Sequence, residues 1–202
     1  MKKLILKDYI YHTKVKEHHN IKNFILDEIE KTNKESLKVA NNYFNDSIDK
    51  LDWSESEDFE RPWVKFFLPH FSDTIDEFLK DSLYCGIQLK DMWYQQYLND
   101  DTHGWHIHGY HYTGVYYLEF PKKSSKTELI FPYNNKFQKI NNVSEGDIII
   151  FPSHTMHRGL PNKSKRKTII SFNFNIMCDK IDIDKITNLS TSWWRVNSNE
   201  NT

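Results

Sequence analysis

The sequence predicts a mainly β fold, a sandwich or a barrel, with helices at its N-terminal end. From Gly86 onward, short aromatic and β-branched runs such as 147–152 (DIIIFP) and 167–176 (KTIISFNFNI) are separated by turn-forming stretches such as SEGD. Before Gly86, apolar residues recur at helical spacing. Several short strands at close intervals are typical of sandwiches and barrels, not of parallel α/β sheets.

The size of the chain predicts one domain. Its 202 residues are 38% hydrophobic and 15% aromatic, which is enough for one well-formed core. The tail is polar except for Trp193 and Trp194, which we expect to dock onto the body of the protein. The single domain expected over 1–202 therefore has three parts: a mostly helical N-terminal region over 1–85, a β core over 86–178, and a C-terminal tail over 179–202.

Helical signals in the N-terminal region differ in strength. In 21–33, apolar residues recur at helical spacing with acids and lysines between them, which predicts an amphipathic helix. Residues 35–51 are expected to form a second helix, although an Asn pair disfavours it. The charged stretch 52–63 predicts a loop, and Ser72 predicts the N-cap of a helix over 72–82.

Composition argues against several classes of protein. The chain has 27 basic and 28 acidic side chains, so no overall field attracts nucleic acid or an anionic membrane. Its longest apolar run is far shorter than the ~20 residues that span a bilayer, and its first residues lack the pattern of a signal peptide. Cys85 and Cys178 have no close spacing, which excludes a disulfide framework and a thiolate zinc site. We therefore expect a cytoplasmic protein that binds neither nucleic acid nor membrane.

Three histidines suggest a metal site. His106 and His108 form a His-Ile-His triplet, and alternate residues of a strand point to the same face of a sheet. His157 follows about 50 residues later, after another strand and a turn. Three imidazoles around one point would hold a divalent transition metal and leave coordination positions open for substrate or dioxygen. Such a site should lose its metal below the usual histidine pKa, near ~6.5.

A histidine taken alone is more often a surface residue or a hydrogen-bonded core residue than a metal ligand. The chain has ten histidines, and His103, His111 and His154 compete for the same role. Position favours His106, His108 and His157 over these competitors, because strand ends and the loops beside them commonly carry functional groups.

The segments WHIHGYHYTGVYYLEFP, ELIFP, EGDIIIFPSHTMHRG and RKTIISFNFNI, over about residues 90–176, resemble the 2-oxoglutarate/iron(II)-dependent oxygenases. The resemblance is strongest to a branch frequent in marine bacteria and their phages. It implies a double-stranded β-helix, the jelly-roll barrel also found in cupins, with iron(II) inside one mouth of the barrel and 2-oxoglutarate as cosubstrate.

The chain departs from the usual pattern of this family at one ligand. Members typically carry His-x-Asp/Glu and a distal His, the facial arrangement of non-haem iron oxygenases. Here His108 occupies the position of the carboxylate. This departure leaves three alternatives: a three-His iron centre, a carboxylate ligand from Asp100 or Asp101 that swings in, or impaired catalysis. The three-His centre is favoured, because only His108 has the right phase relative to His106.

The resemblance also implies a cation that binds the distal carboxylate of 2-oxoglutarate. The family places it about ten positions after the distal His, where this chain has Arg166 and Lys167. Lys167 shares a strand face with Ser171 and Asn173, whereas Arg166 shares the more apolar face. Since the lumen should be the more polar side, Lys167 is favoured and Arg166 is the alternative.

The same alternation suggests other residues that could bind the cosubstrate. A tyrosine or amide from the strand faces could donate or accept a hydrogen bond, although aromatic strand residues more often belong to the core. The candidates are Tyr94, Gln96, Tyr117 and Asn173.

The sequence therefore predicts an iron(II)- and 2-oxoglutarate-dependent oxygenase that hydroxylates a C–H bond and releases succinate and CO₂. The substrate is expected to be a small molecule or a peptide, with a prolyl-type hydroxylase as the interpretation by analogy. Two alternatives stay open: a cupin-type three-His metalloenzyme that does not use 2-oxoglutarate, and a non-catalytic barrel that serves as a binding module.

Overall fold

The computed structural model describes residues 8–32, 35–40, 45–82, 84–131, 136–178 and 193–195, which form two α-helices and twelve strands. In chain order these elements are β1 (Tyr11–Lys14), α1 (His18–Lys31), β2 (Glu35–Ala40), β3 (Asn45–Leu51), a short 3-10 helix (Trp53–Glu55), α2 (Pro62–Ser82), β4 (Gly86–Leu98), β5 (His103–His106), β6 (Tyr112–Glu119), β7 (Thr127–Phe131), β8 (Lys136–Lys139), β9 (Asp147–Pro152), β10 (Met156–Gly159), β11 (Arg166–Met177) and β12 (Trp193–Arg195).

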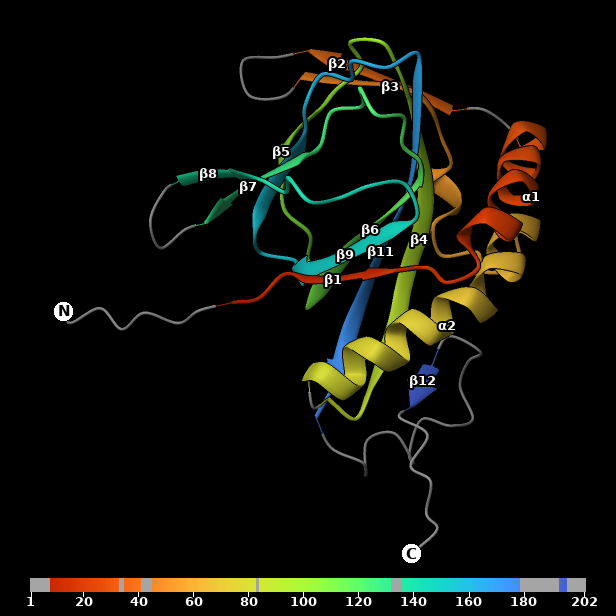
Figure 1. Ribbon diagram of the computed structural model, residues 1–202, viewed down its shortest axis with the longest axis vertical. Helices are drawn as coiled ribbons and strands as arrows, with labels where there is room; N and C mark the ends of the chain where they lie inside the picture. The colour runs from red at the N-terminus through yellow and green to blue at the C-terminus, as the bar shows by residue number, and fades with distance from the viewer. Residues whose placement is uncertain are drawn as a thin grey trace, which may run out of the picture.

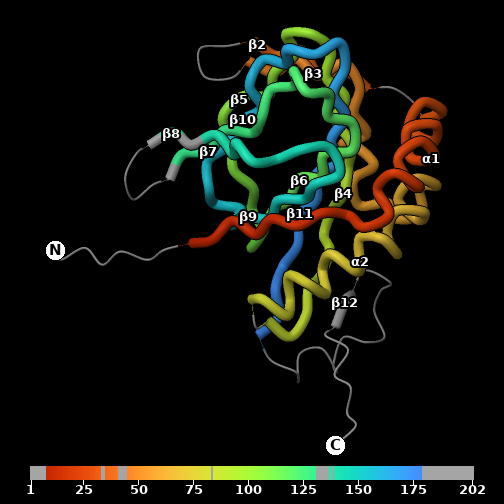
Figure 2. Tube along the Cα trace, in the orientation of Figure 1, coloured from red at the N-terminus to blue at the C-terminus, as the bar shows by residue number. Residues whose placement is uncertain are grey.

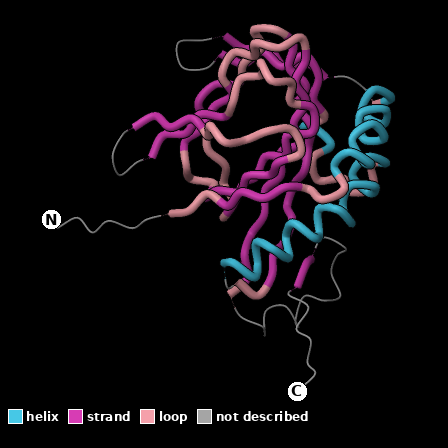
Figure 3. The backbone as a smooth tube through the Cα atoms, viewed as in Figure 1, coloured by secondary structure: helices cyan, strands magenta, loops and turns pink. Residues whose placement is uncertain are grey.

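The strands form two antiparallel sheets that together make a jelly roll (Figure 1). The larger sheet has the order β1-β9-β6-β11-β4-β3-β2, with β12 added beside β4, and the smaller sheet has the order β5-β10-β7-β8. Both helices lie against one face of the larger sheet (Figure 3). The prediction of a mainly β jelly-roll barrel with N-terminal helices is confirmed.

The larger sheet is buried on both faces. In β9, Ile148 and Ile150 pack toward the helices, whereas Ile149 and Phe151 belong to a second cluster between the two sheets. Alternate side chains of one strand thus serve two cores. This double burial explains why DIIIFP is continuously apolar, since neither side of the strand meets water.

Helix α1 agrees with the prediction for 21–33, although it begins earlier, at His18. Helix α2 begins ten residues before the predicted position, so the prediction of Ser72 as an N-cap is wrong. The apolar stripe continues upstream through Trp63 and Phe67, which are fully buried, and this burial extends the helix. Pro62 occupies its first position, where a missing N–H costs nothing.

The expected helix over 35–51 is also wrong. This segment forms β2 and β3, which pair with each other, and β3 continues the sheet by pairing Lys50 and Leu51 with β4. Pairing to an existing sheet edge and burial of Ile48 outweigh the local helical pattern. The N-terminal region thus supplies three strands to the larger sheet in addition to its two α-helices.

The described part of the tail returns to the body. Strand β12 pairs with Gly86–Gln88 at the start of β4. None of the helices in the described ranges combines the length and apolar character needed to cross a bilayer.

Candidate metal centre

Two strands far apart in sequence bring the histidines together. Strand β10 pairs with β5 so that His157 lies opposite His106, and the two strands run side by side in Figure 2. His108 lies just beyond the end of β5, where its backbone N–H donates to the carbonyl oxygen of Ser153 at 3.0 Å. We call His106, His108 and His157 the histidine triad.

The rings of the triad converge on one point. One ligand atom from each ring lies within 4.8 Å of the others. The centroid of the His106 ring is 4.2 Å from that of His157 and 5.1 Å from that of His108. The Nε2 atoms of His108 and His157 are 3.3 Å apart. An ion between these nitrogens would meet three ligands from one side and keep the opposite side open.

Hydrogen bonds prepare two members of the triad for metal binding. The Nδ1 atom of His106 lies 2.8 Å from the carbonyl oxygen of Gly104, and that of His157 lies 2.9 Å from the carbonyl oxygen of Thr155. A carbonyl can only accept, so each Nδ1 carries the proton and each Nε2 keeps its lone pair. The donor set therefore fits a d-block metal.

Burial also keeps the triad neutral. Desolvation lowers the pKa of all three rings, and in His157 and His108 the nearby His106 lowers it further. The pKa of His108 falls to about 3. Since a protonated imidazole cannot bind metal, proton competition should begin at lower pH than the ordinary histidine range near ~6.5.

The two aspartates considered as alternative ligands are held elsewhere. Asp101 accepts hydrogen bonds from the Ser47 hydroxyl and, at 2.8 Å, from the backbone N–H of Leu98. Asp100 adopts a positive φ of 65° in the turn after β4 and pairs with Lys163 at 2.7 Å. Both carboxylates stabilise this turn, so the structure gives no support to Asp100 or Asp101 as a ligand.

The competing histidines lie outside the triad. His103 is the nearest, with its ring stacked 3.9 Å from that of His106 and one ring nitrogen 3.5 Å from the Gln95 amide. His111 is exposed and accepts the N–H of Ile176, and His154 is exposed on the surface. His103 thus lines the site, whereas His111 and His154 lie outside the residues that line it.

Lys167 points into the barrel. Its side chain is only 3% exposed, and its Nζ lies 4.1 Å from the centre of the Tyr97 ring and 3.5 Å from the carbonyl oxygen of Ser125. No carboxylate among the described residues forms an ion pair with it. Burial lowers the pKa of this amine to about 8. A buried cation without an anionic partner is suited to bind a carboxylate ligand.

Arg166 points to the other face of β11. Its Nε lies 2.8 Å from Oε2 of Glu119, and its Nη1 lies 3.1 Å from Oε1 of Glu30 on α1. Its charge is therefore already balanced, on the side of the sheet away from the histidines.

Tyr94 and Gln96 also lie on the face away from the triad, so their assignment to the lumen is wrong. The Tyr94 hydroxyl lies 2.8 Å from that of Thr32, and Gln96 donates to the Thr168 hydroxyl at 3.1 Å. The helices cover this face of β4. Asp52 links the strand to the start of α2, because it accepts hydrogen bonds from the backbone N–H of Tyr94 and the indole N–H of Trp63.

Tyr117 and Asn173 have the expected orientation but different surroundings. Tyr117 lines the lumen, and its hydroxyl lies 2.8 Å from that of Thr127. Asn173 lies against the triad, with its Nδ2 3.3 Å from Nδ1 of His108. Asn173 thus contacts a proposed ligand and not the cosubstrate region around Lys167.

Sequence reasoning separated the two faces of β4 but chose the wrong one for the lumen. Trp93, Gln95 and Tyr97 line the cavity with the triad, and the Trp93 indole N–H is buried without a hydrogen-bond partner. The register of β4 and β11 explains this placement, because Tyr97 pairs with Lys167 and Trp93 with Ser171. Knowledge of that register would have identified these residues.

The free space around the triad is small. The cavity there has a volume of about 30 Å³, which is room for about two water molecules. A second cavity of about 330 Å³ adjoins it and shares Gln95 and His103 with it. Its other walls come from the β2–β3 hairpin and from Trp53. A bound cosubstrate therefore requires lumen side chains such as that of Lys167 to move.

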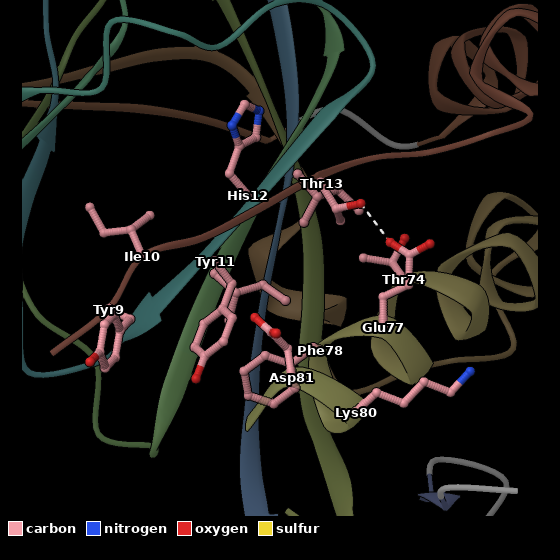
Figure 4. A pocket seen from close by; sticks show the side chains of 12 residues that line it. Tyr9, Ile10, Tyr11, His12, Thr13, Thr74, Glu77, Phe78, Lys80 and Asp81 are labelled. Atoms are coloured by element: carbon pink, nitrogen blue, oxygen red, sulfur yellow. Dashed lines mark hydrogen bonds between the residues drawn. The ribbon is translucent and has the colours of Figure 1, made fainter. Parts of the chain in front are cut away.

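A further groove, of about 770 Å³, opens between β1 and the C-terminal half of α2 (Figure 4). Tyr11 and Phe78 line it with their ring centroids 4.8 Å apart, and Thr13 donates to Glu77 at 2.7 Å. It includes Ile148 and Ile150, which are on the helix side of the larger sheet. The sheet therefore separates this groove from the triad.

Comparisons with known proteins agree with this geometry. Residues 91–175 match a family model described as "Putative 2OG-Fe(II) oxygenase". No curated protein matches the sequence. A viral collagen prolyl hydroxylase from Paramecium Bursaria Chlorella virus-1, solved with 2-oxoglutarate, superposes with a TM-score of 0.56 at 17% identity, covering 82% of this chain and 95% of that chain.

Other solved structures share the fold at similarly low sequence identity. A prolyl hydroxylase from Trichoplax adhaerens has a TM-score of 0.58 at 14% identity, covering 82% of this chain and 83% of its own. The carbocyclase SnoK from nogalamycin biosynthesis has a TM-score of 0.63 at 10% identity, covering 92% and 88%. Likeness at these identities establishes the fold alone.

The family match and the histidine triad show that residues 91–175 are similar to the β core of the 2OG-Fe(II) oxygenases. The description of that family names iron(II) as its metal and 2-oxoglutarate as its cosubstrate.

Proposed function

We propose that the histidine triad binds iron(II) and that Lys167 binds the distal carboxylate of 2-oxoglutarate. The observation that carries this assignment is the convergence of three neutral imidazoles within 4.8 Å, on the same lumen as a buried lysine that has no carboxylate partner among the described residues. Iron and 2-oxoglutarate, once bound, supply the oxidising chemistry: one oxygen atom of dioxygen enters succinate as CO₂ is lost, and the other hydroxylates a C–H bond.

The residues of the chain position the reactants and exclude water. Gly104 and Thr155 orient two imidazoles through their carbonyl oxygens, which fixes the tautomer that each ring presents. Lys167 and Tyr117 lie in the same cavity as the triad, so one cosubstrate molecule could contact them and the metal. Trp93 offers an unpartnered N–H in the same lumen.

We propose a peptidyl side chain as the substrate, with a small molecule as the alternative. Two of the proteins that share the fold are prolyl hydroxylases, and one of them was solved with a peptide fragment. The 330 Å³ cavity beside the triad is lined by Leu37, Ile48, Leu51 and Trp53, which suit an apolar side chain. Its shared wall at Gln95 and His103 would place that side chain next to the metal.

The deciding experiment measures metal binding and turnover separately. Protein purified without oxygen is titrated with iron(II) and then supplied with 2-oxoglutarate and air, and succinate is quantified. The proposal expects one iron per chain and slow succinate formation even without substrate. Iron binding without succinate would instead indicate a cupin-type enzyme, and no iron binding would indicate a binding module.

We further propose that the protein acts in the cytoplasm of a bacterial cell and is encoded by a phage. The sequence resemblance to a branch of marine bacteria and phages supports this origin, and one protein that shares the fold is viral. Fractionation of infected cells with an antibody against the protein tests the location, and membrane-bound or exported protein would contradict it.

A further inference from the structure

Asn173 occupies an irregular position in the β4–β11 ladder. It pairs with Asp91 across the two strands, and the register shifts immediately after it, between Asn173 and Phe174. Such bulges re-aim side chains and are frequent beside active sites. Asn173 is 1% exposed and Asp91 is 8% exposed, so both polar side chains must find partners inside the protein.

One nitrogen of Asn173 serves two neighbours. Its Nδ2 lies 2.7 Å from Oδ1 of Asp91 and 3.3 Å from Nδ1 of His108. Its own Oδ1 is buried and has no hydrogen-bond partner. The amide orientation is not arbitrary, because an ionised carboxylate can only accept and Nδ2 must therefore face Asp91.

This orientation determines the tautomer of His108. An amide N–H donates, so Nδ1 of His108 has to accept and the proton of the neutral ring is on Nε2. That N–H points to Nε2 of His157, 3.3 Å away, whose own Nδ1 is protonated and bonded to Thr155. His106 and His157 thus offer a lone pair at Nε2, whereas His108 offers a proton there.

Metal binding through Nε2 of His108 needs the other tautomer. The proton must move to Nδ1, where it needs an acceptor, and a half-turn of the Asn173 amide would present the unpartnered Oδ1 to it. The same half-turn turns Oδ1 toward Asp91, which is repulsive while that carboxylate is ionised and favourable once it carries a proton.

We propose that Asp91, acting through the Asn173 amide, sets which ring nitrogen of His108 carries the proton and thereby controls whether this histidine can bind iron. The inference rests on the proposed role of His108 as a ligand. Asp91 and Asn173 are positioning residues, since Asp91 contacts Asn173 and Asn173 contacts the triad at His108.

The surroundings of Asp91 make both states accessible. Burial raises the pKa of Asp91 to about 6, against hydrogen bonds from Asn173 and Tyr110 that lower it, and the charge of Glu57 raises it further. A proton on this carboxyl group is therefore within reach near neutral pH. At pH 8 the amide should face Asp91 with its nitrogen, and at pH 5 with its oxygen.

The tautomer can be measured without any metal. Imidazole nitrogen chemical shifts from ¹⁵N-histidine NMR distinguish a ring protonated at Nε2 from one protonated at Nδ1. At pH 8, wild-type His108 is expected to be protonated at Nε2. Asp91→Asn is expected to move the proton to Nδ1, because the amide introduced by this substitution can donate to Oδ1 of Asn173. A wild-type ring already protonated at Nδ1, or an unchanged ring in the variant, would overturn the inference.

Two further measurements distinguish a specific effect of Asp91 from misfolding of the variant. Wild-type protein at pH 5 should show the same shift of the proton to Nδ1, so the test does not depend on a variant. Asn175→Ala removes an asparagine from the same strand that bonds to the backbone of His111, and it should leave the His108 tautomer unchanged. A change of tautomer in this control would overturn a specific role for Asp91.

Affinity for cobalt(II), titrated without oxygen, gives the second readout. Outer-shell partners of ligating histidines typically change metal affinity by about 10- to 100-fold. Asp91→Asn should therefore tighten cobalt binding about tenfold at pH 8, and weaker or unchanged binding would contradict the inference. Absence of cobalt or iron binding in every form would overturn the proposed function, whereas the NMR result would still decide whether Asp91 sets the tautomer.

Discussion

The amine of Lys167 lies 4.1 Å from the centre of the Tyr97 ring, and the two residues are paired across β11 and β4. The ring face carries partial negative charge and stabilises the ammonium group where no carboxylate of the described residues does. This contact keeps a charged side chain inside the barrel, on the same lumen as the histidine triad. It also defines where a carboxylate ligand would find its counterion.

Replacing Lys167 with methionine should abolish tight binding of 2-oxoglutarate. Loss of one member of a buried charge pair costs about 2 kcal/mol or more, which corresponds to about 30-fold or more in affinity. Iron affinity should not change, because Lys167 is outside the triad and its Nζ lies against the Tyr97 ring and the carbonyl oxygen of Ser125. Isothermal titration of the manganese-loaded protein with 2-oxoglutarate measures this loss.

Arg166→Ala is the matched control for Lys167. Its guanidinium pairs with Glu119 and Glu30 outside the lumen, so 2-oxoglutarate affinity should stay within about twofold of the wild type. Stability should fall by no more than about 1 kcal/mol, because the ion pairs are partly exposed. A large loss of cosubstrate affinity in this variant, with none in Lys167→Met, would reverse the assignment.

The affinity for 2-oxoglutarate should decline above pH 8. Burial lowers the pKa of Lys167 to about 8, so the free protein loses this cation as the pH rises through that value. The cosubstrate binds the charged form, and its apparent dissociation constant should rise by up to about tenfold for each pH unit above the pKa. The dissociation constant measured from pH 6 to 9 should show a single break, and Lys167→Met should show none.

The metal-free protein should lose stability as the pH falls below 6.5. The triad is neutral in the folded state because burial depresses each pKa, to about 3 for His108, whereas the unfolded chain takes up protons near 6.5. Between these values the unfolded state binds more protons, so the free energy of unfolding falls by up to about 1.4 kcal/mol per pH unit for each histidine. Urea titrations at several pH values should show a smaller slope for His108→Ala, and an equal slope would argue against a buried neutral ring.

Local patterns predicted the strands and the candidate ligands because that information lies in neighbouring residues. Alternation along β11 separates the lumen face of Lys167 from the outer face of Arg166, as the structure shows. The same reasoning failed for Tyr94 and Gln96, since no pattern among neighbouring residues indicates which face of β4 the helices cover. That face is determined by contacts from distant residues, such as that of Asp52 with the backbone of Tyr94.

The wrong prediction of a helix over 35–51 has the same origin. Residues 35–51 contain enough helix-favouring side chains to suggest a helix, but the edge of β4 offers backbone partners that the local pattern does not reveal. The contact between Asn173 and His108 was equally out of reach, because it joins β11 to a residue just beyond the end of β5 and no local pattern specifies that approach.

Gly114→Ala should strongly destabilise the protein. A Cβ atom at this position would lie 2.1 Å from Cζ of Phe172, the residue that pairs with Gly114 across β6 and β11. The Phe172 ring is fully buried against α2, where it meets Phe71 at 4.6 Å, so it has little space to move. Overpacking of this kind costs about 1–3 kcal/mol, occasionally more. Gly109→Ala provides the control, because a Cβ there meets nothing within 4 Å. Equal midpoints of urea unfolding for the two variants would show that the sheet and α2 are less tightly packed than this contact requires.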